Sequence, residues 1–160
     1  MISPTHGKVN MDEIVSIIQK TVEKNPQDTY KVIVGTDSQN FADTKMVLVI
    51  ALQRVGKGGI FFYEVQHIPK IVDMRTKLFL ETQNSLDCAN QLLDAFERLH
   101  EKTGFDYTQL SFGIHVDAGF HGKTTALIPE IVAWVNALGY GCVVKPDSFV
   151  ASSIADRISK

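Results

Sequence analysis

Only two cysteines, Cys88 and Cys142, occur in this sequence, and no apolar run approaches the length of a membrane span. The cysteines have neither CxxC nor Cys/His spacing, which argues against a redox or metal-binding motif and indicates two buried thiols. The first residues lack a charged region followed by an apolar core, so we expect no signal peptide. A cytoplasmic protein without a membrane span is the resulting expectation.

Charge of one sign is not in excess either. The sequence has 16 basic and 18 acidic residues, a formal net charge of -2. Strong non-specific binding of nucleic acid usually requires a basic domain, although a local basic patch beside an acidic site would not show in this total. With 160 residues, 44% of them hydrophobic and 21% charged, the composition is typical of one globular domain, and we expect residues 1–160 to form it.

Several familiar catalytic motifs are missing. No HxH or HExxH spacing is present, which argues against a zinc site, and the GxSxG motif of hydrolases is absent. The stretch 119–125 is similar to a phosphate-binding loop, but the position of its first required glycine is held by Asp117. We therefore reject a nucleotide triphosphatase. Lys123, near the start of a predicted helix, stays a candidate for contact with a phosphate.

Hydrophobic periodicity predicts that helices and strands alternate along most of the chain. Helices are predicted over 11–24, with Asn10 as its N-cap, and over 76–102, 124–138 and 148–160; strands are predicted over 31–36, 45–55, 60–67, 110–116 and 140–144. The first three strands have short connections, which favours an antiparallel meander. The later strands follow helices and should run parallel to their partners. The simplest packing is an α/β fold with a mixed five-stranded sheet flanked by helices.

Two of the apolar strands end in an aspartate. Asp37 follows the strand 31–36, and Asp117 follows the strand 110–116. Ligands of open α/β sheets bind beyond the carboxyl ends of the strands. If the two strands are parallel neighbours, their ends lie roughly 5 Å apart, and a shared divalent cation would remove the repulsion between the carboxylates. The alternative is that each aspartate only caps the turn after its strand.

Further acids are candidates by their position. Glu81 borders the apolar stripe of the helix 76–102, whereas Asp87 lies nearer its solvent side; a surface glutamate near a helix N-terminus is the alternative. Asp147 precedes the last predicted helix and suits an N-cap, and Asp156 lies within that helix away from its apolar face. The pattern does not choose between these two. His115 should share a strand face with Asp117.

Several segments together resemble a known family. They are Gly35-Thr-Asp-Ser-Gln39, His115-Val-Asp-Ala-Gly119, Gly122-Lys-Thr124, Lys145-Pro146, Ala151-Ser152, Ala155-Asp156 and the opening His6-Gly-Lys-Val9. The chain resembles, over almost its whole length, the bacterial YkuK-like family of predicted ribonuclease H-like, RuvC-type nucleases. The resemblance implies a ribonuclease H-like fold with sheet order 3-2-1-4-5 and an extra N-terminal helix. The first and fourth strands are then adjacent and parallel.

The resemblance also implies a site and an activity. The catalytic residues and metal ligands carried over from the family are Asp37, Glu81, Asp117 and Asp156, which would hold Mg²⁺ or Mn²⁺. Candidates for contact with substrate phosphates, or for support of the ligands, are Ser38, Gln39, His115 and Lys123. The expected function is metal-dependent hydrolysis of phosphodiester bonds in DNA or RNA. Two alternatives stay open: a catalytically silent nucleic-acid-binding or assembly module, and a small-molecule phosphate binder. The oligomeric state is not predicted.

Overall fold

A computed structural model describes residues 1–118, 122–145 and 147–148. The strands and helices, in chain order, are β1 (Ile2–Ser3), β2 (Gly7–Lys8), α1 (Met11–Lys24), β3 (Tyr30–Asn40), β4 (Thr44–Arg54), β5 (Gly59–Ile68), α2 (Met74–Thr103), β6 (Ser111–His115), α3 (Ile128–Ala137) and β7 (Gly141–Val143). Short 3-10 helices occupy Tyr107–Gln109 and Thr125–Leu127. The helix predicted over 148–160 falls almost entirely outside the described residues.

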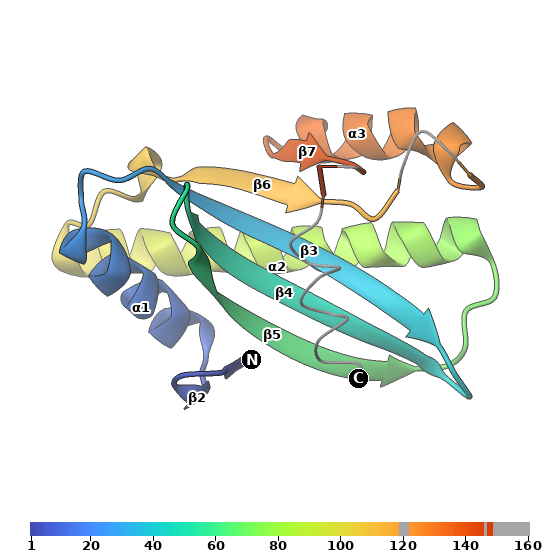
Figure 1. The fold of residues 1–160 in the computed structure, drawn as a ribbon, viewed down its shortest axis with the longest axis horizontal. Coiled ribbons are helices and arrows are strands. Elements are labelled where there is room, and N and C mark those ends of the chain that lie inside the picture. The colour runs from blue at the N-terminus through green and yellow to red at the C-terminus, as the bar shows by residue number, and fades with distance from the viewer. Residues whose placement is uncertain (119–121, 146, 149–160) are drawn as a thin grey trace.

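All described strands belong to one mixed sheet with the order β2-β1-β5-β4-β3-β6-β7. Figure 1 shows the long strands β5, β4, β3 and β6 side by side. β3, β4 and β5 form an antiparallel meander, whereas β6 pairs in parallel with β3 and β7 in parallel with β6. Leaving β1 and β2 aside and numbering the remaining strands along the chain gives the order 3-2-1-4-5. The predicted topology is therefore confirmed, with the strand that ends near Asp117 next to the strand that carries Asp37.

The sheet has seven strands rather than the predicted five because the N-terminal residues form a small hairpin at its edge. β1 and β2 have two residues each, too few to show a periodic pattern. The turn between them is held by Ser3, whose Oγ accepts hydrogen bonds from the amides of Thr5 and His6. Gly7 takes the positive φ of 73° that closes the hairpin. Turn chemistry of this kind leaves no hydrophobic periodicity in the sequence.

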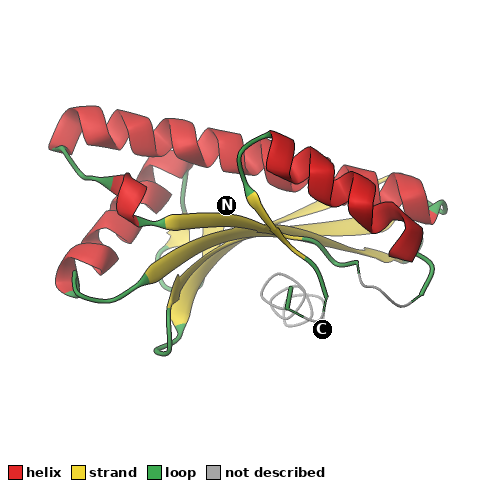
Figure 2. Cartoon of the chain, turned by 90° about the horizontal axis from the view of Figure 1, so that it is seen from above, coloured by secondary structure: helices red, strands yellow, loops and turns green. Residues whose placement is uncertain are grey.

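The main core lies between the sheet and the helices, which cover one of its faces (Figure 2). β3 contributes Tyr30, Val32 and Val34 to this core, so the even-numbered residues of β3 face the helices. α2 is anchored there by Phe96, whose ring contacts an aromatic cluster made of Phe105, Tyr107 and Phe112. Within the described part of the chain, no helix is long and apolar enough to cross a membrane.

α1 begins and ends where the sequence predicts. Asn10 is its N-cap: its side chain accepts a hydrogen bond from the amide of Glu13 at 2.8 Å, and the Glu13 carboxylate accepts one from the amide of Asn10 at 3.2 Å. Each bond satisfies a backbone donor that the first helical turn leaves unpaired. The apolar stripe of α1 places Ile14, Ile18 and Val22 in the core, beside α2.

Replacing Asn10 with alanine should lower the free energy of unfolding by about 1 kcal/mol, because both bonds of this capping box depend on the asparagine side chain or its geometry. Urea unfolding followed by circular dichroism measures the change. Asn10→Ser is the matched control, since serine also caps helices, and it should keep most of the stability. Equal losses in both variants would contradict the capping explanation.

Candidate functional site

Asp37 and Asp117 occupy matching positions on neighbouring parallel strands. β3 and β6 pair from Lys31 opposite Ser111 to Gly35 opposite His115. Continued two residues beyond the last observed pair, this register would set Asp37 opposite Asp117, with the strands about 4.8 Å apart. β6 ends at His115 whereas β3 continues to Asn40, so the two strands stop pairing two residues before the acids. Open α/β sheets bind their ligands at such a place.

Asp37 lies inside β3, whereas the apolar pattern predicts a strand that ends at residue 36, with Asp37 just after it. The antiparallel ladder with β4 continues to Asn40 opposite Thr44, and it pairs Asp37 with Val47. The strand continues through polar residues after its apolar run, so the hydrophobic pattern alone predicts its end too early. The aspartate is held by a regular ladder rather than by a flexible turn, and its Oδ1 accepts a hydrogen bond of 3.0 Å from the amide of Ser38.

The side chains around Asp37 alternate between the two faces of the sheet. Thr36 forms a hydrogen bond of 2.8 Å with Ser85 of α2, and Ser38 donates a hydrogen bond to Glu81 of the same helix. Thr36 and Ser38 therefore face the helices, and Asp37, which lies between them, faces the opposite side. Ile114 of β6, and Val116 and Ala118 just beyond that strand, belong to the main core, so Asp117, which lies between the last two, also faces away from the helices.

Glu81 is a buried carboxyl group in the second turn of α2, with 7% of its surface exposed. Burial raises its pKa to about 8; the hydrogen bond from Ser38 opposes this increase, and the negative charges of Asp37 and Asp117 add to it. Without a bound cation, Glu81 is therefore largely protonated at neutral pH. Asp87, by contrast, is exposed, and its Oδ1 accepts a hydrogen bond of 2.7 Å from Nε2 of Gln83. The helix therefore directs Glu81 and not Asp87 toward β3.

Lys145 forms an ion pair with Asp117, and sequence reasoning assigned it no role. Its Nζ lies 2.7 Å from Oδ1 of Asp117. The hydrogen bond to Asp117 and the charge of that carboxylate raise the pKa of Lys145, and the charges of Asp37 and Glu81 contribute further. The only sequence feature that pointed to this contact was the position of Lys145 just after the predicted strand 140–144. Periodicity did not reveal it, because the pairing of β6 with β7 is a long-range contact.

The other predicted residues lie around this acid pair at different depths. Ser38 is buried and Gln39 is half-buried, both on β3. His115 is half-buried on the same face as Asp117, and burial lowers its pKa to about 4, with the charge of Lys31 as a smaller cause. The imidazole is therefore neutral at neutral pH. It suits hydrogen bonding better than attraction of an anion.

Lys123 is exposed, and the helical segment after it begins as a 3-10 helix rather than as the predicted α-helix. The predicted helix 124–138 is replaced by a 3-10 turn, Thr125–Leu127, followed by α3 from Ile128. Pro129, at the start of α3, is well suited to the first turn of a helix but lacks the backbone donor of an interior position. Lys123 is thus five residues from the helix that was expected to support phosphate binding.

The acids do not form a complete metal site within the described residues. Across 1–118, 122–145 and 147–148, no three His, Cys, Asp or Glu side chains are grouped so that they could hold one metal ion. Glu81 is turned toward Ser38 on the helix side of β3, away from the face of Asp37 and Asp117. Asp156, the fourth predicted ligand, lies outside the described residues, and Asp147 is exposed.

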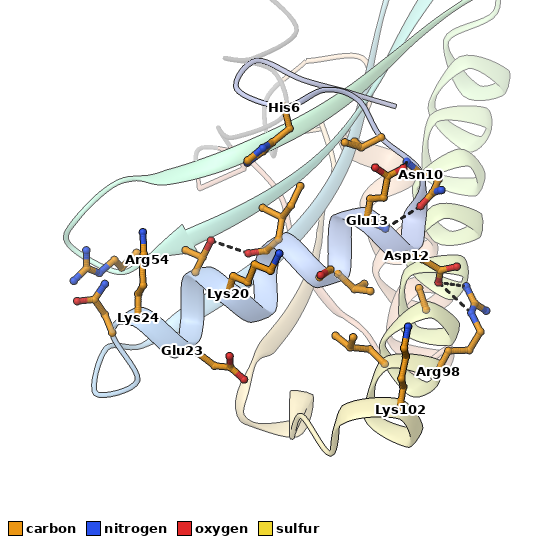
Figure 3. Close-up of a pocket in the computed structure, with 18 residues that line it drawn as sticks. His6, Asn10, Asp12, Glu13, Lys20, Glu23, Lys24, Arg54, Arg98 and Lys102 are labelled. Atoms are coloured by element: carbon orange, nitrogen blue, oxygen red, sulfur yellow. Dashed lines mark hydrogen bonds and ion pairs between the residues drawn. The ribbon is translucent and has the colours of Figure 1, made fainter.

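A groove of about 1380 Å³ lies elsewhere, along α1 and the C-terminal half of α2 (Figure 3). None of the predicted site residues lines it. Its charged side chains are of both signs: Lys20, Lys24, Arg54, Arg98 and Lys102 with Asp12, Glu13 and Glu23. Arg98 and Asp12 already form an ion pair of 2.9 Å within it. The mixed charge does not single out a ligand, so the acid pair remains the candidate site.

The sequence profile of the ribonuclease H-like family matches residues 13–160 of this chain. The chain belongs to the ribonuclease H-like family. A relative from Bacillus subtilis (strain 168), named uncharacterized protein YkuK, is 31% identical over 163 residues, which cover 98% of this chain and 94% of the relative. These matches confirm the resemblance to YkuK-like, ribonuclease H-like proteins. No solved structure matches this ribonuclease H-like chain significantly.

Proposed function

We propose that this ribonuclease H-like protein is a metal-dependent nuclease that hydrolyses phosphodiester bonds in DNA or RNA. The observation that carries the proposal is the parallel register of β3 and β6, which ends with Gly35 opposite His115 and, continued by two residues, would bring Asp37 beside Asp117. Glu81, a third carboxyl group, is buried on the other side of β3. Carboxylate oxygens are the donors that Mg²⁺ and Mn²⁺ prefer, so the residues fit such an ion in their chemistry.

Each acid has a distinct part in this proposal. Asp37 would contact both ions of a two-ion site. Asp117 and Glu81 would each complete the coordination shell of one ion, and Asp156 would be the fourth ligand. When bound, the ions activate the attacking water and stabilise the leaving oxygen. To join the other two acids, the side chain of Glu81 would have to leave Ser38 and reorient from the helix side of β3, and its proton would pass to solvent. Gln39 and neutral His115 would orient the substrate, and Lys123 would contact its phosphates.

A catalytically silent binding or assembly module is the second candidate, because two of the acids already have an ion-pair or hydrogen-bond partner within the protein. Asp117 is paired with Lys145, and Glu81 is bonded to Ser38. Such a module would keep the fold without a need for metal. A small-molecule phosphate binder is less well supported, because the loop with Lys123 leads into a 3-10 turn rather than into the N-terminus of a helix.

The test is hydrolysis of a panel of RNA–DNA hybrid, duplex and branched substrates by the purified protein. Reactions contain Mn²⁺, Mg²⁺ or excess EDTA, and thermal unfolding is measured under the same conditions. Cleavage that requires the divalent ion, together with stabilisation by that ion, supports the nuclease. No cleavage and no change of melting temperature with either ion would contradict it and would support the silent module.

A further inference from the structure

Lys145 brings a positive charge into the site at the position where a metal ligand is proposed. Its Nζ is 2.7 Å from Oδ1 of Asp117. We propose that Lys145 is a built-in counter-cation of the acid pair, and that its ion pair with Asp117 competes with a divalent cation for the same carboxylate. This inference rests on the proposed function, since it concerns the metal affinity of the same site.

The backbone fixes Lys145 beside Asp117. The amide of Val116 donates a hydrogen bond of 2.9 Å to the carbonyl of Val143, and the amide of Lys145 donates one of 2.8 Å to the carbonyl of Ala118. These bonds extend the pairing of β6 and β7 beyond the last paired residues, His115 and Val143. Only the side chain of Lys145 has to move for the carboxylate to be released.

The ammonium group of Lys145 responds to more than one acid. Cys142 and Val144 pack against the main core, so Lys145, next along this stretch, faces the same side of the sheet as Asp37 and Asp117. The charges of Asp37 and Glu81, as well as that of Asp117, raise the pKa of Lys145. A positive charge at this point relieves the repulsion among acids that would otherwise face each other without compensation.

The ion pair between Lys145 and Asp117 is weak enough for a divalent cation to replace the lysine. The side chains of Lys145 and Asp117 are 54% and 27% exposed, so the ammonium group reaches solvent although Oδ1 of Asp117 is itself buried. Ion pairs between partly exposed side chains contribute only about 0–1 kcal/mol. Lysine carries a compact charge on a flexible stem, so its ammonium group can leave without disturbing the strand. Once released, it lies at the rim of the site, where it can meet the phosphate of a substrate.

The test measures Mn²⁺ affinity by isothermal titration calorimetry without substrate, so that its result does not depend on activity. Lys145→Met should bind Mn²⁺ about three- to fivefold more tightly than the wild type, because the competing ion pair, worth up to about 1 kcal/mol, is gone. Lys145→Arg keeps the ion pair and should stay within about twofold of the wild type. Lys102→Met removes one remote exposed lysine and should leave the affinity unchanged.

Thermal unfolding gives a second measurement. In EDTA, Lys145→Met should melt below the wild type, and saturating Mn²⁺ should abolish this difference. Lys145→Gln replaces Lys145→Met if the latter does not fold. If the neutral variant binds Mn²⁺ as the wild type does, or more weakly, the role of Lys145 is wrong while the metal site stands. If no variant binds Mn²⁺, the metal site itself and the proposed nuclease are wrong as well.

Discussion

Replacing Asp37 with asparagine is expected to lower Mn²⁺-dependent cleavage by at least about 100-fold while the fold is kept. Loss of a residue that only supports a metal ligand already costs about 10–100-fold, so loss of the ligand shared by both ions should cost more. An asparagine Oδ1 can still accept the hydrogen bond that Asp37 receives from the amide of Ser38. Initial rates at saturating Mn²⁺, with circular dichroism spectra of both proteins, measure the effect.

Asp87→Asn is the matched control for this substitution. It removes the same charge from an exposed position of α2 and should leave cleavage within about twofold of the wild type. Mn²⁺ should raise the melting temperature of Asp87→Asn as it does that of the wild type, and raise that of Asp37→Asn much less. Equal Mn²⁺ shifts in all three proteins would show that Asp37 does not bind the ion.

Replacing Glu81 with glutamine is expected to stabilise the metal-free protein by about 4 kcal/mol at pH 8. Burial raises the pKa of Glu81 to about 8 from its ordinary value of 4.5, so the folded state holds a proton that the unfolded state releases. Wild-type stability should therefore fall as the pH rises from 4.5 to 8, by at most about 1.4 kcal/mol per pH unit from this group. Glutamine is neutral at every pH, and its side-chain carbonyl can still accept the hydrogen bond from Ser38.

Urea unfolding in EDTA between pH 4.5 and pH 8.5 checks this expectation. The stability curves of wild type and Glu81→Gln should nearly meet at the acid end and diverge toward the alkaline end. Glu97→Gln, at an exposed position on the same helix, is the control and should follow the wild-type curve. Parallel curves for wild type and Glu81→Gln would show that Glu81 is ionised in the folded protein.

Much of the fold follows from periodicity in the sequence. The three strands of the meander, the two parallel strands and the limits of α1 are confirmed, because each has a clear apolar stripe or alternation. The burial of Glu81 follows in the same way, since it borders the stripe of α2. The matching positions of Asp37 and Asp117 required the order of the strands, which the element order and the family resemblance supplied together.

What the sequence did not reveal depends on contacts between distant residues. The partner of Lys145 is set by the pairing of β6 and β7, and the partner of Glu81 by the packing of α2 on β3. Periodicity reports which face of an element a residue occupies, but not which side chain it meets there. For the same reason, the three acids could be named from the sequence, while the division of Asp37 and Glu81 between opposite faces of β3 could not.

α2 has 30 residues, so it is roughly 45 Å long and spans the whole sheet. Glu81 lies about 22 Å along this helix from the aromatic cluster around Phe96. A tilt of only about 5° at that cluster would displace Glu81 by roughly 2 Å, several times the roughly 0.5 Å within which a functional constellation must be held. The position of Glu81 therefore depends on how firmly the buried side chains of α2, and the hydrogen bond between Thr36 and Ser85, hold the helix on the sheet.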